Sequence, residues 1–209
     1  MKQTHRLSML LALLALVLGP IAFAEDAKES APEAETPDPL AVENFTLVDP
    51  WGKKHSLHDY KGKWIVLEWT NKGCPYVKKH YESNNMQTLQ KKYTEKGVVW
   101  LSICSSAEGK EGYMTPEAWK EYLEKVGAKA TATLIDADGR VGRKMGAKVT
   151  PHMWVLDPKL RKVYEGAIDD KRNARKPEEI AEAKNYVAAA LDAGMAGKEI
   201  EVPSTRPYG

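Results

Sequence analysis

Apolar and polar residues follow each other in a pattern that predicts strands separated by helices. Two almost unbroken apolar runs, 64–69 and 98–103, are typical of parallel strands that are buried on both faces of a sheet. Further short strands are expected at 45–48, 53–57, 133–135, 153–156 and 162–164. The first two of these flank an Asp-Pro-Trp-Gly turn and therefore predict an N-terminal β-hairpin.

Segments with helical periodicity lie between these strands. Helices are expected over 75–96, with a kink or split at 83–85, over 115–127, and over 180–194. Strands that alternate with helices and end in a hairpin predict an α/β domain with a central mixed sheet flanked by helices.

The two ends of the chain differ from this domain. Lys2 and Arg6 precede an apolar run from Leu7 to Leu18, and Ala22-Phe23-Ala24 follows, which is typical of a secretory signal peptide. An uncleaved membrane anchor is the alternative. The run is shorter than the roughly 20 residues of a membrane span, so we expect cleavage, export to the periplasm or the extracellular space, and no stable membrane insertion afterwards. The expected order is a signal peptide at 1–24, a flexible Ala/Glu/Pro-rich linker at 25–40, one domain at 41–195 and an irregular C-terminal tail at 196–209.

Charge and cysteine content exclude several classes of function. The chain has 31 basic and 29 acidic residues, and loss of the signal peptide would leave 29 of each. This balance argues against nucleic acid as a partner and against a polybasic membrane-surface protein. Only two cysteines are present, which excludes a disulfide-rich scaffold and a cysteine-type structural zinc site.

Cys74 is the strongest candidate for a reactive group. It follows a predicted buried strand and directly precedes Pro75, a residue favoured in the first turn of a helix. Free backbone N–H groups and the positive end of the helix dipole stabilise a thiolate at such a position. The alternative is an unreactive cysteine that packs as a small hydrophobic residue. Because ligands bind at the carboxyl edge of the sheet in α/β folds, we favour a reactive thiol.

Three segments resemble the thioredoxin-like superfamily. They are Tyr60-Lys61-Gly62-Lys63-Trp64, Gly73-Cys74-Pro75-Tyr76-Val77 and Gly146-Ala147-Lys148-Val149-Thr150-Pro151-His152. The second segment and the run from Gly166 to Asp170 are similar to the peroxiredoxin-like redoxin branch, the AhpC/TSA type. The resemblance implies a thioredoxin-like fold in which Pro151 is a cis-proline facing Cys74. It also implies substrate contacts at Pro75, Tyr76 and Thr150.

The chain departs from both patterns of this superfamily. Thioredoxins use C-x-x-C, and Val77 stands where the second cysteine would be. Typical peroxiredoxins have Thr or Ser three residues before the reactive cysteine and Pro seven before it, where this chain has Asn71 and Leu67. The resemblance therefore supports the fold more strongly than a particular reaction.

Glu68 and Cys104 are further candidates for catalytic roles. Glu68 interrupts an apolar strand at the position where thioredoxins carry a buried acid, so the resemblance implies that it accepts the thiol proton. Burial without a charged partner would raise its pKa; the alternatives are a pair with Lys61 or Lys63, or exposure to solvent. Cys104 ends the next predicted strand at the same sheet edge and is either the resolving thiol or a packing residue.

These residues favour an exported thiol oxidoreductase with Cys74 as its nucleophile. A peroxide or a protein disulfide is the expected substrate, and an external thiol reductant is the expected partner. We expect no organic cofactor, and no metal, because the histidines form no paired ligand motif. The alternative function is a non-catalytic binding or scaffold protein that has kept the fold and lost the second thiol.

Overall fold

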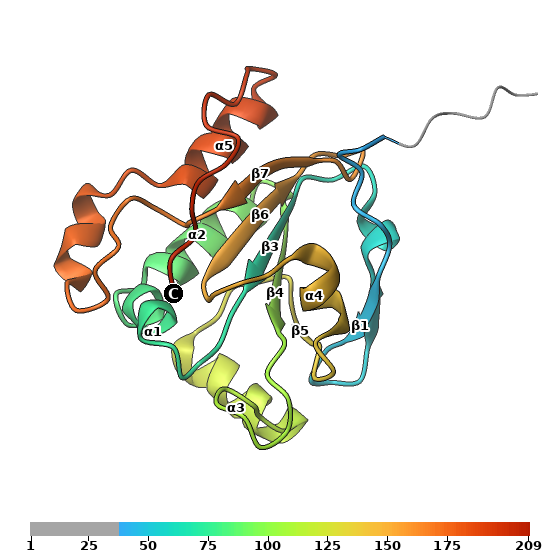
Figure 1. Ribbon diagram of the computed structural model, residues 1–209, viewed down its shortest axis with the longest axis vertical. Helices are drawn as coiled ribbons and strands as arrows, with labels where there is room; N and C mark the ends of the chain where they lie inside the picture. The colour runs from blue at the N-terminus through green and yellow to red at the C-terminus, as the bar shows by residue number, and fades with distance from the viewer. Residues whose placement is uncertain (1–37) are drawn as a thin grey trace, which may run out of the picture. The chain divides into compact units, whose positions relative to one another are not determined.

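The computed structural model describes residues 38–209, so the predicted signal peptide and nearly all of the predicted linker lie outside the described residues. The described part is built on a seven-stranded sheet with the strand order β2-β1-β5-β4-β3-β6-β7 (Figure 1). The strands are β1 (Thr46–Val48), β2 (Lys54–Ser56), β3 (Ile65–Trp69), β4 (Val99–Cys104), β5 (Ala132–Ile135), β6 (His152–Leu156) and β7 (Lys162–Gly166).

The sheet is mixed, as the sequence predicts. Strand β3 pairs in parallel with β4 and antiparallel with β6, while β4 pairs in parallel with β5. The N-terminal hairpin β1–β2 extends one edge, because Val48 pairs with Ile135. The carboxyl ends of β3 and β4 therefore lie next to the amino end of β6, at the edge of the sheet where these strands end or begin. The chain on either side of this edge carries Cys74, Cys104 and Pro151.

Five α-helices accompany the sheet in the described residues: α1 (Pro75–Glu82), α2 (Asn85–Thr94), α3 (Pro116–Val126), α4 (Arg140–Met145) and α5 (Tyr186–Met195). The predicted split at 83–85 is confirmed: Asn84 has φ of 60° and separates α1 from α2. Helix α3 begins as expected, because the Thr115 side chain accepts a hydrogen bond from the amide of Ala118. Within residues 38–209, no helix has the length and apolar character needed to cross a membrane.

Two helical segments differ from the sequence-based expectation. Helix α4 was not predicted, because it has six residues and lies between Gly139 and Gly146, too short a run for a periodic pattern. The last helix begins at Tyr186 and not at Ile180. Ile180 belongs to a separate 3-10 helix, Pro177–Glu182, so its apparent periodicity with Val187 was misleading.

The sheet separates two hydrophobic clusters. Val66, Trp100 and Val155 face the side on which α1, α2 and α5 pack. Alternate residues of the same strands, such as Leu67 and Trp154, face the opposite side, against α4 and the N-terminal segment. Both faces are buried, which explains the unbroken apolar runs of β3 and β4.

Residues 203–209, called the strap below, lie beside β7. Ser204 forms a parallel β-bridge with Glu165. The amide of Glu165 donates to the carbonyl of Pro203 at 3.1 Å, and the amide of Thr205 donates to the carbonyl of Glu165 at 3.0 Å. The strap has no helix or named strand, yet its backbone is fixed to the sheet.

His152 gives the fold a predicted sensitivity to acid. It is 1% exposed on β6, and neither ring nitrogen has a hydrogen-bond partner. Burial lowers its pKa to about 4. As the pH falls from 6.5 to 4, the unfolded chain gains a proton that the folded chain excludes, so stability is lost. We expect His152 to lower the free energy of unfolding by about 2 kcal/mol as the pH falls from about 7 to about 4.5.

His152→Phe should therefore lose less stability than the unsubstituted protein over this pH interval, as measured by urea unfolding. His58→Phe, at an exposed position, is the matched control for removal of a histidine. An equal loss in the His152 variant and the unsubstituted protein would contradict the prediction.

Candidate active site

Cys74 lies in the connection between β3 and α1, directly before the first residue of the helix. Its extended backbone makes it the N-cap residue, and its carbonyl accepts a hydrogen bond from the amide of Lys78 at 3.0 Å. Asn71 shapes the preceding turn, because its Oδ1 accepts from the amide of Gly73 at 2.7 Å and its carbonyl accepts from the amide of Cys74 at 3.1 Å. The sequence Asn-Lys-Gly-Cys-Pro thus forms a turn that delivers the thiol to a helix N-terminus.

The thiol of Cys74 faces the loop that precedes β6. Its Sγ donates a hydrogen bond to the carbonyl oxygen of Thr150 at 2.9 Å. The Thr150–Pro151 peptide bond is cis, and Pro151 is buried. The structure therefore brings together Cys74, Thr150 and Pro151, the arrangement that the resemblance implied. Cys74 as a whole is only partly buried.

The other two predicted substrate contacts occupy different environments. Pro75 is exposed at the first helical position. Tyr76 is half-buried, and its ring centroid lies 5.7 Å from that of Tyr208 in the strap. Pro75 can therefore meet a molecule that approaches from solvent, whereas Tyr76 lies against a segment of the chain itself.

Glu68 is fully buried in β3 and has four hydrogen-bond donors around it. Oε1 accepts from the hydroxyl of Tyr81 at 2.9 Å. Oε2 accepts from Trp100 Nε1 and Ser102 Oγ, both at 2.8 Å, and from Gln90 Nε2 at 3.1 Å. Burial raises the pKa of the Glu68 carboxyl, and the hydrogen bonds from the four donors oppose this only in part.

These contacts decide among the possibilities left open for Glu68. It is not exposed, and it pairs with neither Lys61 nor Lys63, which are both exposed. No hydrogen bond joins its carboxylate to Cys74. Glu68 therefore holds α1 and α2 against β3 and β4, and it has no direct route for the proton of the Cys74 thiol.

Cys104 lies at the end of β4 in a different environment. It is 3% exposed and packs with Met114 and Trp119. Its Sγ lies 3.8 Å from the carbonyl oxygen of Gly112. Both cysteines are free thiols. The sheet edge thus carries Cys74 and Cys104 in separate surroundings, without a bond between them.

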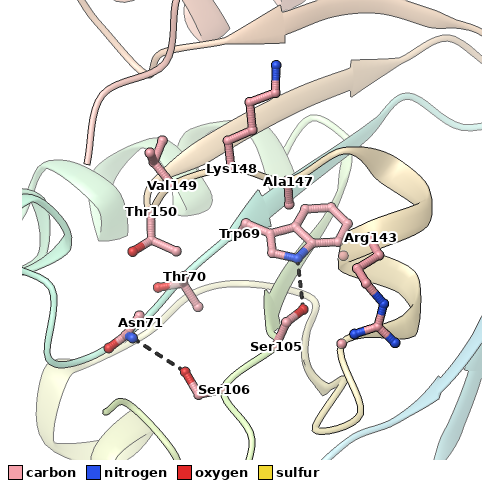
Figure 2. Close-up of a pocket in the computed structure, with 12 residues that line it drawn as sticks. Trp69, Thr70, Asn71, Ser105, Ser106, Arg143, Ala147, Lys148, Val149 and Thr150 are labelled. Atoms are coloured by element: carbon pink, nitrogen blue, oxygen red, sulfur yellow. Dashed lines mark hydrogen bonds between the residues drawn. The ribbon is translucent and has the colours of Figure 1, made fainter. Parts of the chain in front are cut away.

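A pocket of about 400 Å³ with a mixed polar and apolar lining opens beside Thr150 (Figure 2). Trp69 Nε1 donates to Ser105 Oγ at 3.0 Å on one wall, and Asn71 Nδ2 donates to Ser106 Oγ at 3.4 Å on another. Arg143 of α4 also lines the pocket. Ser105, Ser106 and Arg143 were not predicted as site residues. The available signal was the two serines directly after a buried strand, at the sheet edge where ligands bind.

The chain is similar to known proteins of redox function. Residues 40–164 match the AhpC/TSA family. The thiol-disulfide oxidoreductase ResA of Bacillus thuringiensis subsp. konkukian (strain 97-27) is 29% identical over 114 residues, which cover 54% of this chain and 60% of that protein. ResA of Bacillus cereus (strain ATCC 10987 / NRS 248) matches with the same identity and coverage. The match thus spans 60% of the length of these curated relatives.

Solved structures show the same thioredoxin-like fold. An uncharacterized conserved protein from Geobacillus kaustophilus has a TM-score of 0.67 and 25% identity, with coverage of 81% of this chain and 87% of that chain. A hypothetical protein from Sinorhizobium meliloti 1021 has a TM-score of 0.64 and 24% identity, with coverage of 78% and 88% respectively. A putative thiol:disulfide interchange protein DsbE from Chlorobium tepidum has a TM-score of 0.52 and 19% identity, with coverage of 71% and 94%.

Glu68→Gln should change the pH profile of Cys74 alkylation. The substitution removes a buried titrating group, whose pKa is raised by burial, from the contact between α1 and the sheet. We therefore expect the profile, measured as the rate of iodoacetamide labelling at Cys74, to lose one titration step. Glu82→Gln, which removes the same charge from the exposed end of α1, is the control. An unchanged profile in the Glu68 variant would show that Glu68 is purely structural.

Proposed function

Because the chain belongs to the AhpC/TSA family, we propose that it is a thiol–disulfide oxidoreductase in which Cys74 attacks a substrate disulfide. The observation that carries the proposal is the position of the Cys74 sulfur, 2.9 Å from the carbonyl oxygen of Thr150 and at the N-terminus of α1. The similarity to proteins named thiol-disulfide oxidoreductase supports the disulfide as the substrate.

The proposed reaction begins with loss of the Cys74 proton to water or buffer. The free backbone N–H groups of the first helical turn and the helix dipole favour the resulting thiolate. The thiolate attacks one sulfur of a disulfide R–S–S–R, a Cys74–S–S–R bond forms, and R–S⁻ leaves with the electron pair of the broken bond. Thr150 and Pro151 form the wall against which the substrate sulfur lies.

An external thiol completes the proposed cycle. Val77, at the position of the second thiol in C-x-x-C, is fully buried and apolar. Cys104 is buried with Met114 and Trp119. We therefore propose that a thiolate R′–S⁻ from solution attacks the substrate sulfur of the mixed disulfide, which forms R–S–S–R′ and releases the Cys74 thiolate. Cys104 would be the resolving residue only if the loop around Gly112 opened.

Peroxide is a second candidate substrate, favoured by membership of the AhpC/TSA family. The Cys74 thiolate would attack one peroxide oxygen, with formation of a sulfenic acid and departure of hydroxide or alkoxide. Asn71 uses its side chain to hold the turn before Cys74 and supplies no hydroxyl. We therefore propose that reaction with a disulfide is the faster of the two.

The proposed place of this activity is outside the cytoplasm. The support for it is the signal-peptide pattern of residues 1–24, with Ala22-Phe23-Ala24 before the expected cleavage position. An exported thiol enzyme requires a source of reducing equivalents in the same compartment.

Cys74→Ser should abolish formation of a mixed disulfide. The reduced protein is mixed with excess cystine, quenched with acid, and analysed by intact mass and peptide mapping. We expect rapid addition of one cysteine at Cys74, at least about 100-fold slower addition in Cys74→Ser, and a change below about twofold in Cys104→Ser, because a buried thiol reacts slowly. A parallel sample with one equivalent of hydrogen peroxide and dimedone reports the sulfenic acid.

The outcomes separate the candidate functions. A dimedone adduct that forms faster than the mixed disulfide would favour the peroxidase. A Cys74 thiol that reacts with neither reagent would contradict the oxidoreductase proposal and favour a binding or scaffold role.

A further inference from the structure

The strap contacts the residue that holds the Cys74 thiol. Thr205 fixes its first part, because Thr205 Oγ1 accepts from the amide of Ala167 at 2.9 Å and shares a hydrogen bond of 2.7 Å with the hydroxyl of Tyr164. At its other end, a Cβ atom on Gly209 would overlap the carbonyl oxygen of Thr150 and lie 2.7 Å from the Thr150 amide nitrogen. Only glycine allows the strap to approach the Thr150 backbone this closely.

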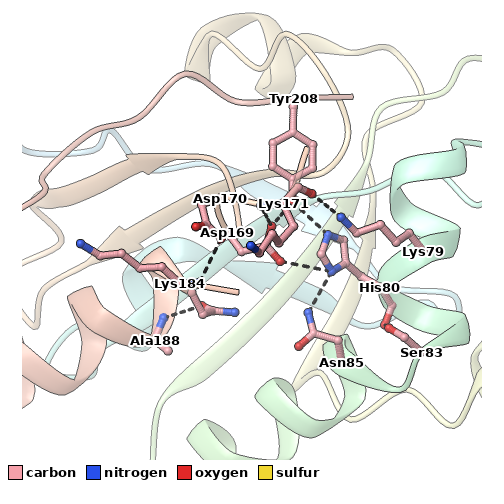
Figure 3. Close-up of polar contacts among 11 residues, drawn as sticks. Lys79, His80, Ser83, Asn85, Asp169, Asp170, Lys171, Lys184, Ala188 and Tyr208 are labelled. Carbon is pink, nitrogen blue, oxygen red and sulfur yellow. Dashed lines mark hydrogen bonds and ion pairs between the residues drawn. The ribbon is translucent and has the colours of Figure 1, made fainter. Parts of the chain in front are cut away.

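Tyr208 anchors the strap beside α1 (Figure 3). It is 8% exposed, and its hydroxyl donates to Oδ1 of Asp169 at 2.5 Å. The same hydroxyl lies 3.2 Å from Nε2 of the fully buried His80, and the ammonium group of Lys79 lies 5.5 Å from the centroid of the Tyr208 ring. These contacts keep the strap in one position next to Tyr76, two residues after Cys74.

The docked strap completes a second pocket, of about 570 Å³, on the α1 side of the loop 148–150. Tyr76 forms one wall and Val149 another, and the strap residues from Arg206 to Gly209 form the rest together with two cations from other segments, Lys148 and Arg172. Arg172 is held in place, because its Nη2 donates to the carbonyl oxygen of Arg206 at 2.6 Å. Lys148 and Val149 line both this pocket and the first one, so the two pockets adjoin at the loop 148–150 (Figure 2).

The charged side chains that line this second pocket are all positive. Lys148, Arg172 and Arg206 line it, and no Asp or Glu side chain does. Within the described range 38–209, none of these three cations forms an ion pair. The pocket is connected to the Cys74 thiol through Val149, because the next residue, Thr150, accepts the hydrogen bond from the Cys74 Sγ. Three cations without ion pairs produce a local field in the pocket that attracts anions.

We propose that this pocket binds the anionic group of a small disulfide substrate, most simply a carboxylate, and so presents the disulfide to Cys74. The inference rests on the proposed function, because it assumes that Cys74 is the attacking thiol. The thiolate forms a bond to the near sulfur, and the far half of the substrate leaves as an anionic thiolate that the same cations stabilise. Arg172 and Arg206 recognise a carboxylate through their planar guanidinium groups.

The test compares two small disulfides that differ in charge. Reduced protein with Cys104→Ser, so that only Cys74 can react, is mixed with dithiobis-nitrobenzoate, which carries two carboxylates, or with neutral dithiodipyridine, and the second-order rate constants are measured. We expect Arg172→Gln, Arg206→Gln and Lys148→Gln each to slow the dianionic reagent about fivefold, and to change the rate with the neutral reagent by less than about twofold.

Arg175→Gln is the matched control, because it removes the same charge from an exposed position three residues after Arg172 and outside the pocket. Equal effects of the Arg175 and Arg206 substitutions on the dianionic reagent would overturn the inference and leave only an effect of net charge. Substitutions in the pocket that slow the reactions with the two disulfides equally would also overturn the inference. Absence of any reaction in the parent protein would instead show that the proposed function is wrong.

Discussion

The buried carboxylate of Glu68 is the constraint on which the active-site geometry depends. A carboxyl group buried away from water needs hydrogen-bond partners, and the donors here come from α1, α2 and β4. Tyr81 belongs to the helix that begins directly after Cys74, so the bond from Tyr81 to Glu68 fixes the helix that presents the thiol. The position of Cys74 against Thr150 follows from this arrangement.

The chain places its two thiols in environments with different chemical consequences. Cys74 is accessible at a helix N-terminus, whereas Cys104 is enclosed by apolar side chains. A reagent from solution can therefore reach the first thiol more readily than the second. With Val77 in the core, a cycle that uses one protein thiol and one thiol from solution is the simplest that agrees with this arrangement.

Much of the fold could be predicted from the sequence, because the pattern of β3 and β4 and the Gly-Cys-Pro turn depend on neighbouring residues. The hydrogen-bond partners of Glu68 could not be predicted. Trp100 and Gln90 are distant from it in sequence, and nothing in the local pattern of their own strand or helix indicates that they contact Glu68. The tail from 196 was expected to be irregular, and it has no helix or named strand, but its docking depends on individual contacts such as those of Tyr208 and leaves no periodic signal.

The most direct test of the central claim is the relative reactivity of the two cysteines within one molecule. The reduced folded protein is treated with a limiting amount of iodoacetamide near neutral pH, and the labelled fractions of Cys74 and Cys104 are quantified by peptide mass spectrometry. The partly buried Cys74 at a helix N-terminus should be labelled at least about 100-fold faster than Cys104, which is 3% exposed. Equal labelling, or faster labelling of Cys104, would contradict the account.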